Sequence, residues 1–199
     1  MIRGVVYDLG CSDSHYKRFI LENADSYVGV DWSNSLHDIN ADIIADLNDR
    51  LPIPDATADT VFSISTLEHL REPKIMLKES YRILKPGGKL IIQTPWQWHV
   101  HEAPFDYYRY SKFGLEYLIA SSGFKNITVE PQFGFFSTIA LKLNYFSERI
   151  FRGPMIVKIL VGAIFIPLWT LTQLVGPIFD MLDRNWQAET GAYLATAEK

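Results

Sequence analysis

Short β-like runs alternate with helical runs over the first two-thirds of the sequence, and this alternation limits the possible fold more than any other feature. The β-like runs, which are short and rich in β-branched residues, cover residues 5–9, 27–31, 41–47, 60–65, 89–95 and 125–131. The helical runs cover residues 15–24, 72–88 and 111–124. Such alternation predicts an α/β fold with a doubly wound, mostly parallel sheet covered by helices.

Capping and turn residues predict where the helices end. Leu77, Tyr81 and Leu84 recur at helical spacing, and we expect Pro86-Gly87-Gly88 to stop that helix. Ser111 has the character of an N-cap for the next helix, which we expect to close near Gly123.

Acidic residues follow the first strands of the predicted sheet. Ligands of such sheets bind at the carboxyl ends of the strands, where Asp8, Gly10, Asp31 and Asp46 would lie. Asp31 stands 23 residues after Asp8, and an acid there typically accepts hydrogen bonds from the ribose of an adenosine-containing cofactor. The alternative is an ordinary polar strand end.

Four stretches of the sequence resemble one family when their order and spacing are taken together. They are "YDLGCSDS", "YVGVDWS", "IIADLNDRLPIPDATADTVFSISTLEHL" and "ESYRILKPGGKLIIQTP". The chain resembles class I S-adenosylmethionine-dependent methyltransferases of the small Rossmann-like type (methyltransferase type 11) from Val5 to about Pro131, and in the terminal strand. The resemblance implies a Rossmann-like sheet with a reversed C-terminal strand, S-adenosylmethionine as cofactor, and methyl transfer as the activity.

The resemblance also implies which residues hold the cofactor. Asp8 and Gly10 match the first acid and first glycine of the cofactor loop, Asp31 the ribose-binding acid, and Asp46 with Leu47 the pair beside the adenine. The full set expected to bind cofactor is Asp8, Gly10, Ser12, Asp31, Trp32, Asp46, Leu47, Ser63 and Ser65.

The cofactor loop departs from the family pattern at two positions. Ser12 and Ser14 stand where the family often has its second and third glycines, which permit close backbone approach or positive φ. Because serine is small and its hydroxyl can pair with a carboxylate, we predict weakened rather than lost binding. The alternative is a non-catalytic, methyltransferase-like protein that acts in assembly. A nicotinamide enzyme is disfavoured because Gly-x-Gly-x-x-Gly is not met.

The loop over residues 96–111 concentrates polar and aromatic side chains at the ligand edge of the sheet. It is either a solvated connector or, as we favour, a substrate-facing loop. It also resembles the His-x-x-Pro-x-Asp-x-x-Arg pattern of a methyltransferase subgroup often encoded with glycan or lipid biosynthesis. That resemblance implies His101 as base, Asp106 as its orienter and Arg109 as an anion or carboxylate clamp. His69, which follows Glu68, is the rival base, although as an isolated histidine we expect it to be structural.

Composition narrows the partners and the compartment. The net charge of −4 shows no basic field, so we expect no nucleic-acid binding. Cys11 is the single cysteine, which excludes an intrachain disulfide, and residues 1–8 lack the apolar core of a signal peptide. We therefore expect a cytoplasmic protein. His99 and His101 lack a nearby third ligand, so we predict no metal site.

A strongly apolar segment precedes the last predicted strand, residues 191–199. Residues 159–179 carry no charge over a length that could span a bilayer. A single span would leave the final strand on the wrong side, and we expect Pro167 to divide the run into two short halves. We therefore predict a helical hairpin or paired amphipathic helices.

We divide the chain into a Rossmann-like domain, residues 1–131 with 192–199, and an apolar helical insertion, residues 132–191. Three interpretations of the insertion stay open: a lid over the substrate, a homodimer interface, and an in-plane membrane anchor. The expected acceptor is a small molecule or a glycan- or lipid-linked intermediate.

Overall fold

The computed structural model describes residues 2–34, 36–149 and 153–199. The chain divides into two compact units. The sheet unit comprises residues 1–95, 99–130 and 193–199, and the hairpin unit comprises residues 96–98 and 131–192.

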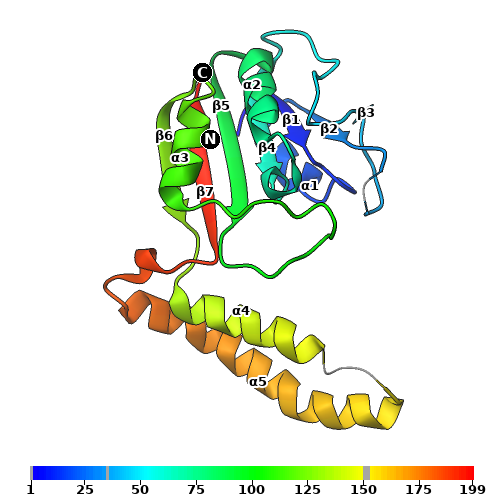
Figure 1. Cartoon of the computed structure of the whole chain (residues 1–199), viewed down its shortest axis with the longest axis vertical. Helices are drawn as coiled ribbons and strands as arrows, with labels where there is room; N and C mark the ends of the chain where they lie inside the picture. The colour runs from blue at the N-terminus through cyan, green and yellow to red at the C-terminus, as the bar shows by residue number, and fades with distance from the viewer. Residues whose placement is uncertain (1, 35, 150–152) are drawn as a thin grey trace. The chain divides into compact units, whose positions relative to one another are not determined.

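The sheet unit is built on seven strands in the order β3-β2-β1-β4-β5-β7-β6 (Figure 1). They are β1 Val5–Leu9, β2 Ser26–Asp31, β3 Ile43–Ile44, β4 Ala58–Ile64, β5 Leu84–Pro95, β6 Lys125–Pro131 and β7 Ala192–Glu198. The pairs β1–β2, β1–β4, β2–β3 and β4–β5 are parallel. The end of β7 pairs with the start of β5, since the N–H of Gly87 donates to the carbonyl of Lys199, and β7 is therefore reversed. The predicted α/β fold with a reversed final strand is confirmed.

The helices of the sheet unit are α1 Lys17–Leu21, η1 Leu67–His69, α2 Pro73–Ile83 and α3 Lys112–Ala120. Ser111 caps α3 as expected, because its side chain accepts a hydrogen bond from the N–H of Gly114. The first helix is shorter than the expected residues 15–24, because the loop after β1 extends through tight turns to Tyr16.

The Pro86-Gly87-Gly88 turn does not end α2, contrary to our expectation. The helix ends at Ile83, and Leu84 is already extended. Pro86 disfavours helix at the residue before it, Lys85, so the helix ends ahead of the turn. The turn instead forms an irregularity inside β5, where Leu84 pairs with Ala58 and Lys89 pairs with Thr60.

The third strand is also shorter than the expected residues 41–47. Asp42 and Asp46 flank it, and both use their carboxylates to accept backbone N–H groups, from Gly29 and Asn48 respectively. Side chains of this kind compete with the strand ladder, so only Ile43 and Ile44 are paired.

The core of the sheet unit is apolar on both faces of the central strands, as expected for a parallel sheet covered by helices. Its largest fully buried apolar side chains are Leu9, Ile20, Leu67, Met76, Leu77, Ile83, Leu84, Leu90, Ile92, Leu115 and Ile119.

The hairpin unit contains α4 Phe135–Glu148 and α5 Met155–Leu182, which pack side by side, followed by the short η2 Trp186–Ala188 (Figure 1). Pro167 does not divide the apolar run, contrary to our expectation, because α5 continues through both Pro167 and Pro177. An interior proline removes one backbone hydrogen bond and crowds the preceding turn, but a helix of 28 residues keeps its remaining bonds.

A buried carboxylate joins the two helices of the hairpin. Asp180, near the end of α5, accepts hydrogen bonds from the N–H groups of Gly134, Phe136 and Ser137 at the start of α4. These N–H groups have no partner within their own helix, so the carboxylate acts as the cap of α4. Further along, the indole N–H of Trp169 donates to the hydroxyl of Ser147 at 2.6 Å.

Candidate active site

The sheet unit contains a cavity of about 560 Å³ at the carboxyl ends of β1, β2 and β4. Loops after these strands line it, together with residues from the loop that follows β5. Eight of the nine residues expected to bind cofactor line this cavity: Asp8, Gly10, Ser12, Asp31, Trp32, Asp46, Leu47 and Ser65. The sequence prediction and the cavity therefore coincide at the edge of the sheet where such folds bind ligands.

Ser63, the ninth expected residue, is buried behind the cavity wall. Its hydroxyl donates to the carbonyl of Leu9 at 2.7 Å, which ties β4 to β1. Within the described residues it does not line the cavity.

The loop after β1 keeps a glycine-like backbone although two of its glycines are replaced. Ser12 has φ of 50° and Ser14 has φ of 65°, both in the left-handed region. Gly10 has φ of 83°, and a Cβ there would lie 2.2 Å from the hydroxyl of Thr66. The serines hold a conformation that costs about 1–2 kcal/mol each for a residue with a side chain.

Acidic side chains hold the loops of the cavity in place. Asp31 accepts the N–H of Ser12 at 2.5 Å on one carboxylate oxygen and the N–H of Trp32 at 2.6 Å on the other. Asp46 accepts the N–H of Asn48 at 2.8 Å. Each oxygen of Asp31 keeps a second lone pair. Oδ1 of Asp46 also accepts the side-chain N–H of Asn48, which leaves Oδ2 for a ligand, so both acids can still accept hydrogen bonds.

Asp8 is the most deeply buried acid of the cavity, with 2% of its surface exposed. Burial raises the pKa of its carboxyl to about 7. The hydrogen bond from the Tyr27 hydroxyl lowers the pKa but is outweighed, and the negative charge of Asp31 raises it further. The Asp8 carboxyl is therefore poised to titrate near neutral pH.

Two contacts bring the loop after β5 over the cavity. His37 Nε2 lies 2.9 Å from Glu102 Oε1, and the rings of Trp32 and Phe105 meet edge to face at 5.3 Å. Glu102, Phe105 and Tyr107 of this loop line the cavity, which agrees with the prediction of a loop that faces the ligand edge.

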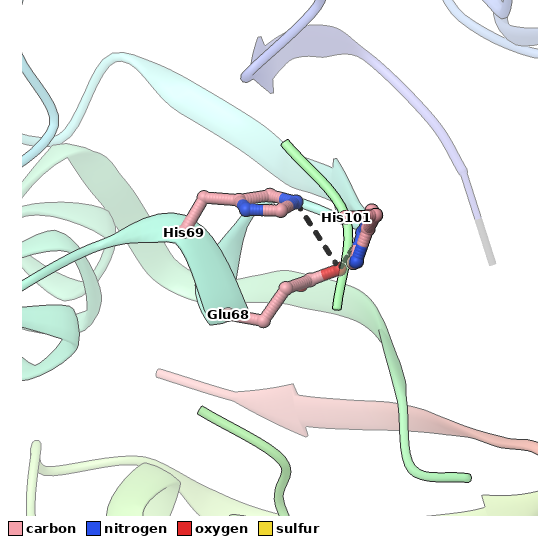
Figure 2. A group of neighbouring side chains, drawn as sticks. All are labelled: Glu68, His69 and His101. Carbon is pink, nitrogen blue, oxygen red and sulfur yellow. Dashed lines mark ion pairs between the residues drawn. The ribbon is translucent and has the colours of Figure 1, made fainter. Parts of the chain in front are cut away.

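A cluster of Glu68, His69 and His101 lies beside the cavity (Figure 2). The Glu68 carboxylate reaches between the two rings, with Oε1 3.7 Å from Nε2 of His69 and 3.9 Å from Nε2 of His101. Glu68 is 0% exposed, and burial raises its pKa to about 8. Of the three, only His69 lines the cavity.

The predicted catalytic residues bind mainly to one another. Arg109 donates to both carboxylate oxygens of Asp106, at 2.5 and 2.7 Å, and to the carbonyl of His99. Asp106 also accepts the N–H of His101. Burial opposes the charge of Asp106, but the hydrogen bonds from Arg109 and from that N–H outweigh it and lower its pKa to about 2.

The predicted catalytic residues lie outside the cavity wall, whereas the rival base lines it. Within the described residues, His101, Asp106 and Arg109 do not line the cavity, and Arg109 fastens the loop through Asp106. His101 has its pKa lowered by burial and by the neighbouring His69, so it is neutral at pH 7. Of His69 and His101, it is His69, the residue expected to be structural, that lines the cavity. The sequence pointed to it only as the rival base that follows Glu68.

Residues 7–92 match a family model described as a methyltransferase domain. A probable S-adenosylmethionine-dependent methyltransferase of Mycolicibacterium smegmatis is 29% identical over 96 residues, which cover 45% of this chain and 37% of that protein. A tRNA U34 carboxymethyltransferase of Nautilia profundicola is 33% identical over 100 residues, which cover 45% and 33%. The chain thus spans about a third of the length of these two relatives.

The fold is similar to that of a solved structure, phosphoethanolamine N-methyltransferase 2 of Haemonchus contortus in complex with S-adenosylmethionine. The TM-score is 0.62 at 18% identity, over 100% of this chain and 49% of the other. The resemblance stated from the sequence motifs is confirmed by the family match and by the fold.

Proposed function

We propose that this chain, a class I Rossmann-like methyltransferase by family match and by fold, transfers the methyl group of S-adenosylmethionine to an acceptor bound beside His69. The observation that carries the proposal is the cavity, which gathers Asp8, Asp31 and Asp46 at the carboxyl edge of one sheet. A cavity of about 560 Å³ falls within the range of ordinary ligand sites.

The residues of the cavity fit the cofactor. Gly10 keeps the loop backbone close to Thr66, where a side chain has no room, and Asp31 has free lone pairs for a pair of ribose hydroxyls. Asp46 and Leu47 offer an acceptor and an apolar surface for a purine ring. Bound in this cavity, the cofactor would supply an electrophilic methyl group on a sulfonium.

The protein's own contribution is to orient an acceptor and to exclude water. The loop after β5 reaches over the cavity through Glu102 and Phe105, which limits solvent access. We assign activation of the acceptor to the cluster of Glu68, His69 and His101, and positioning of His101 to Asp106. The acceptor class that we favour is a small molecule or a lipid-linked intermediate.

The hairpin unit supports the lipid-linked class and a location at a membrane surface. In length and composition α5 could cross a membrane, with a mean hydropathy of 2.0 over an 18-residue stretch that is 6% buried. Its exposed apolar side chains include Ile159, Leu160, Ile164, Leu168, Leu171 and Leu174.

A hairpin also removes the topological objection to membrane contact. The chain leaves the sheet after β6, passes along α4, and returns along α5 to β7, so both strands stay on one side of a bilayer. Asp180 joins the end of α5 to the start of α4. Residues 159–179, which precede it, carry no charged side chain. Dimer formation and a lid are the rival uses of the same surface.

Calorimetric titration of the chain with S-adenosylmethionine and with its demethylated product tests the cofactor proposal, with nicotinamide dinucleotides as controls. We expect both sulfur compounds to bind with one site per chain and the dinucleotides not to bind. If neither sulfur compound binds at millimolar concentration, the alternative of a non-catalytic relative replaces the proposal.

A further inference from the structure

Two buried polar atoms of the Glu68–His69–His101 cluster lack a hydrogen-bond partner among the described residues. They are Oε1 of Glu68 and Nε2 of His69, which lie 3.7 Å apart. Buried polar groups in native proteins are nearly always satisfied, and an exception calls for an ion or a water molecule. The gap between these two atoms is too long for a direct hydrogen bond.

The tautomer of His69 leaves its orphaned nitrogen as a lone pair. Nδ1 lies 2.9 Å from the carbonyl of Phe105, and a carbonyl can only accept, so Nδ1 carries the proton. Nε2 therefore faces Glu68 as an acceptor. A histidine whose other nitrogen donates to a carbonyl is the usual form of a metal-bound histidine.

His101 supplies a third donor atom from another segment of the chain. Its Nε2 lies 3.9 Å from Oε1 of Glu68, and the three donor atoms lie within 4.8 Å of one another (Figure 2). Its Nδ1 lies 3.4 Å from Asp106 and 3.3 Å from Arg109. In the structure the guanidinium of Arg109, which can only donate, is hydrogen-bonded to Nδ1 of His101. Metal binding at Nε2 requires the other tautomer, in which Nδ1 donates to Asp106, 3.4 Å away.

From this geometry we infer that Glu68, His69 and His101 form a site for a divalent transition-metal ion, with an open position toward the cavity. Two imidazoles and one carboxylate are the ligand set of catalytic zinc sites, which keep a position for water or substrate. His69 lines the cavity, so the open position would face the acceptor. The inference rests on the proposed function and names the acceptor class: a molecule with a metal-binding oxygen.

Ligand atoms around a tetrahedral ion at zinc distances lie about 3.3 Å apart. Binding would therefore shorten the 3.7 Å and 3.9 Å separations from Glu68 Oε1 to the two imidazoles by about 0.4 and 0.6 Å. Small rotations of the two imidazoles supply that movement. Our prediction of no metal site rests on His99 and His101 alone, because Glu68 and His69 lie 30 or more residues earlier in the sequence.

The test is calorimetric titration of the chelator-treated full chain with Zn²⁺, with Mg²⁺ as a comparison because it prefers oxygen ligands. We expect one Zn²⁺ per chain, and at least about 100-fold weaker binding in His69→Ala and in His101→Ala. His99→Ala is the matched control, since it removes a histidine of the same loop outside the cluster, and it should bind as the wild type does. Cobalt absorption spectra of the same samples should show histidine ligation that both cluster variants lose.

Glu68→Gln keeps the shape of the side chain and removes the charge, so it serves if an alanine variant fails to fold. Equal Zn²⁺ binding by the wild type and all cluster variants, or no binding by the wild type, would overturn the metal site. Titration of the same samples with S-adenosylmethionine separates this result from the proposed function. Cofactor binding without Zn²⁺ binding would leave the methyltransferase proposal standing and remove only the metal.

Discussion

The N–H of Ser12 donates a 2.5 Å hydrogen bond to Oδ2 of Asp31, which joins the loop after β1 to the end of β2. One side chain therefore has two tasks. It fixes the backbone of a loop that has lost two glycines, and it presents its remaining lone pairs to the cavity.

We predict that Asp31→Ala weakens S-adenosylmethionine binding by about 1.5–3 kcal/mol, or about 10- to 150-fold, because charge-assisted hydrogen bonds are the strong ones. Calorimetry measures the change. The control is Asp38→Ala, which removes an exposed acid whose contact with Ser12 runs through its backbone carbonyl. Unchanged affinity in a folded Asp31→Ala variant would exclude this placement of the ribose.

We predict that Ser12→Gly and Ser14→Gly tighten cofactor binding, by about threefold or more, because glycine lets the loop backbone approach the cofactor more closely. The gain should be larger for Ser12, since Ser14→Gly also loses a 2.8 Å hydrogen bond to the carbonyl of Asn40. Ser33→Gly, an exposed serine beyond β2, is the control. Weaker binding in both loop variants would mean that the hydroxyls contact the ligand.

We predict that Asp8 makes the fold less stable as pH rises from about 4 to about 7. Its pKa is about 7 in the folded chain and 3.8 ordinarily, so the folded state binds the proton more tightly across that window. Asp8→Asn cannot ionise and should gain at most about 4 kcal/mol over the wild type between pH 4 and pH 8. Urea unfolding at both pH values measures this gain. Asp49→Asn, at an exposed acid, is the control, and the same gain there would refute the assignment to Asp8.

We predict that Leu168→Lys and Leu171→Lys release the chain from vesicles of phosphatidylcholine and phosphatidylglycerol. Both leucines are exposed on α5, and a lysine in the apolar part of a bilayer costs about 3 kcal/mol, or about 100-fold in partitioning. Flotation measures release, and Leu171→Phe should float as the wild type does. Light scattering detects the rival outcome, a dimer that the same lysines separate. If the chain neither floats nor self-associates, and the lysine substitutions only unfold it, the segment is intramolecular core.

The fold was predictable because it depends on local patterns. Strand runs, the Ser111 cap and the acids at strand ends can be read directly from the residue order. The errors came where two signals competed. At Pro86–Gly88 the turn motif predicts a helix stop, but the backbone leaves the helix three residues earlier and the turn is accommodated as a bulge. At Pro167 the cost of a proline inside a helix predicts a break, but the long apolar helix continues through it.

The candidate site was harder to predict because its partners are far apart in sequence. Asp31, Asp46 and Gly10 sit at positions that the fold alone brings to one edge. The link between Glu68 and His101 depends on how the loop after β5 folds back, and nothing in the spacing of residues 96–111 determines that path. For the same reason, the pairing of Arg109 with Asp106 could not be told from an outward-facing clamp.

The strand order places β7 between β5 and β6, although β7 follows the whole hairpin in the sequence. During synthesis, which proceeds from the N-terminus, β5 therefore waits with an unpaired edge while about 60 residues of the apolar hairpin are made. β6 cannot join the sheet before β7 is made, because its neighbour in the sheet is β7 and its contacts, such as Thr128 with Thr196, are made to that strand. An unpaired edge and an uncovered apolar helix then coexist on the nascent chain. Early binding of the hairpin to a lipid surface would cover the apolar helix until β7 pairs with the edge of β5.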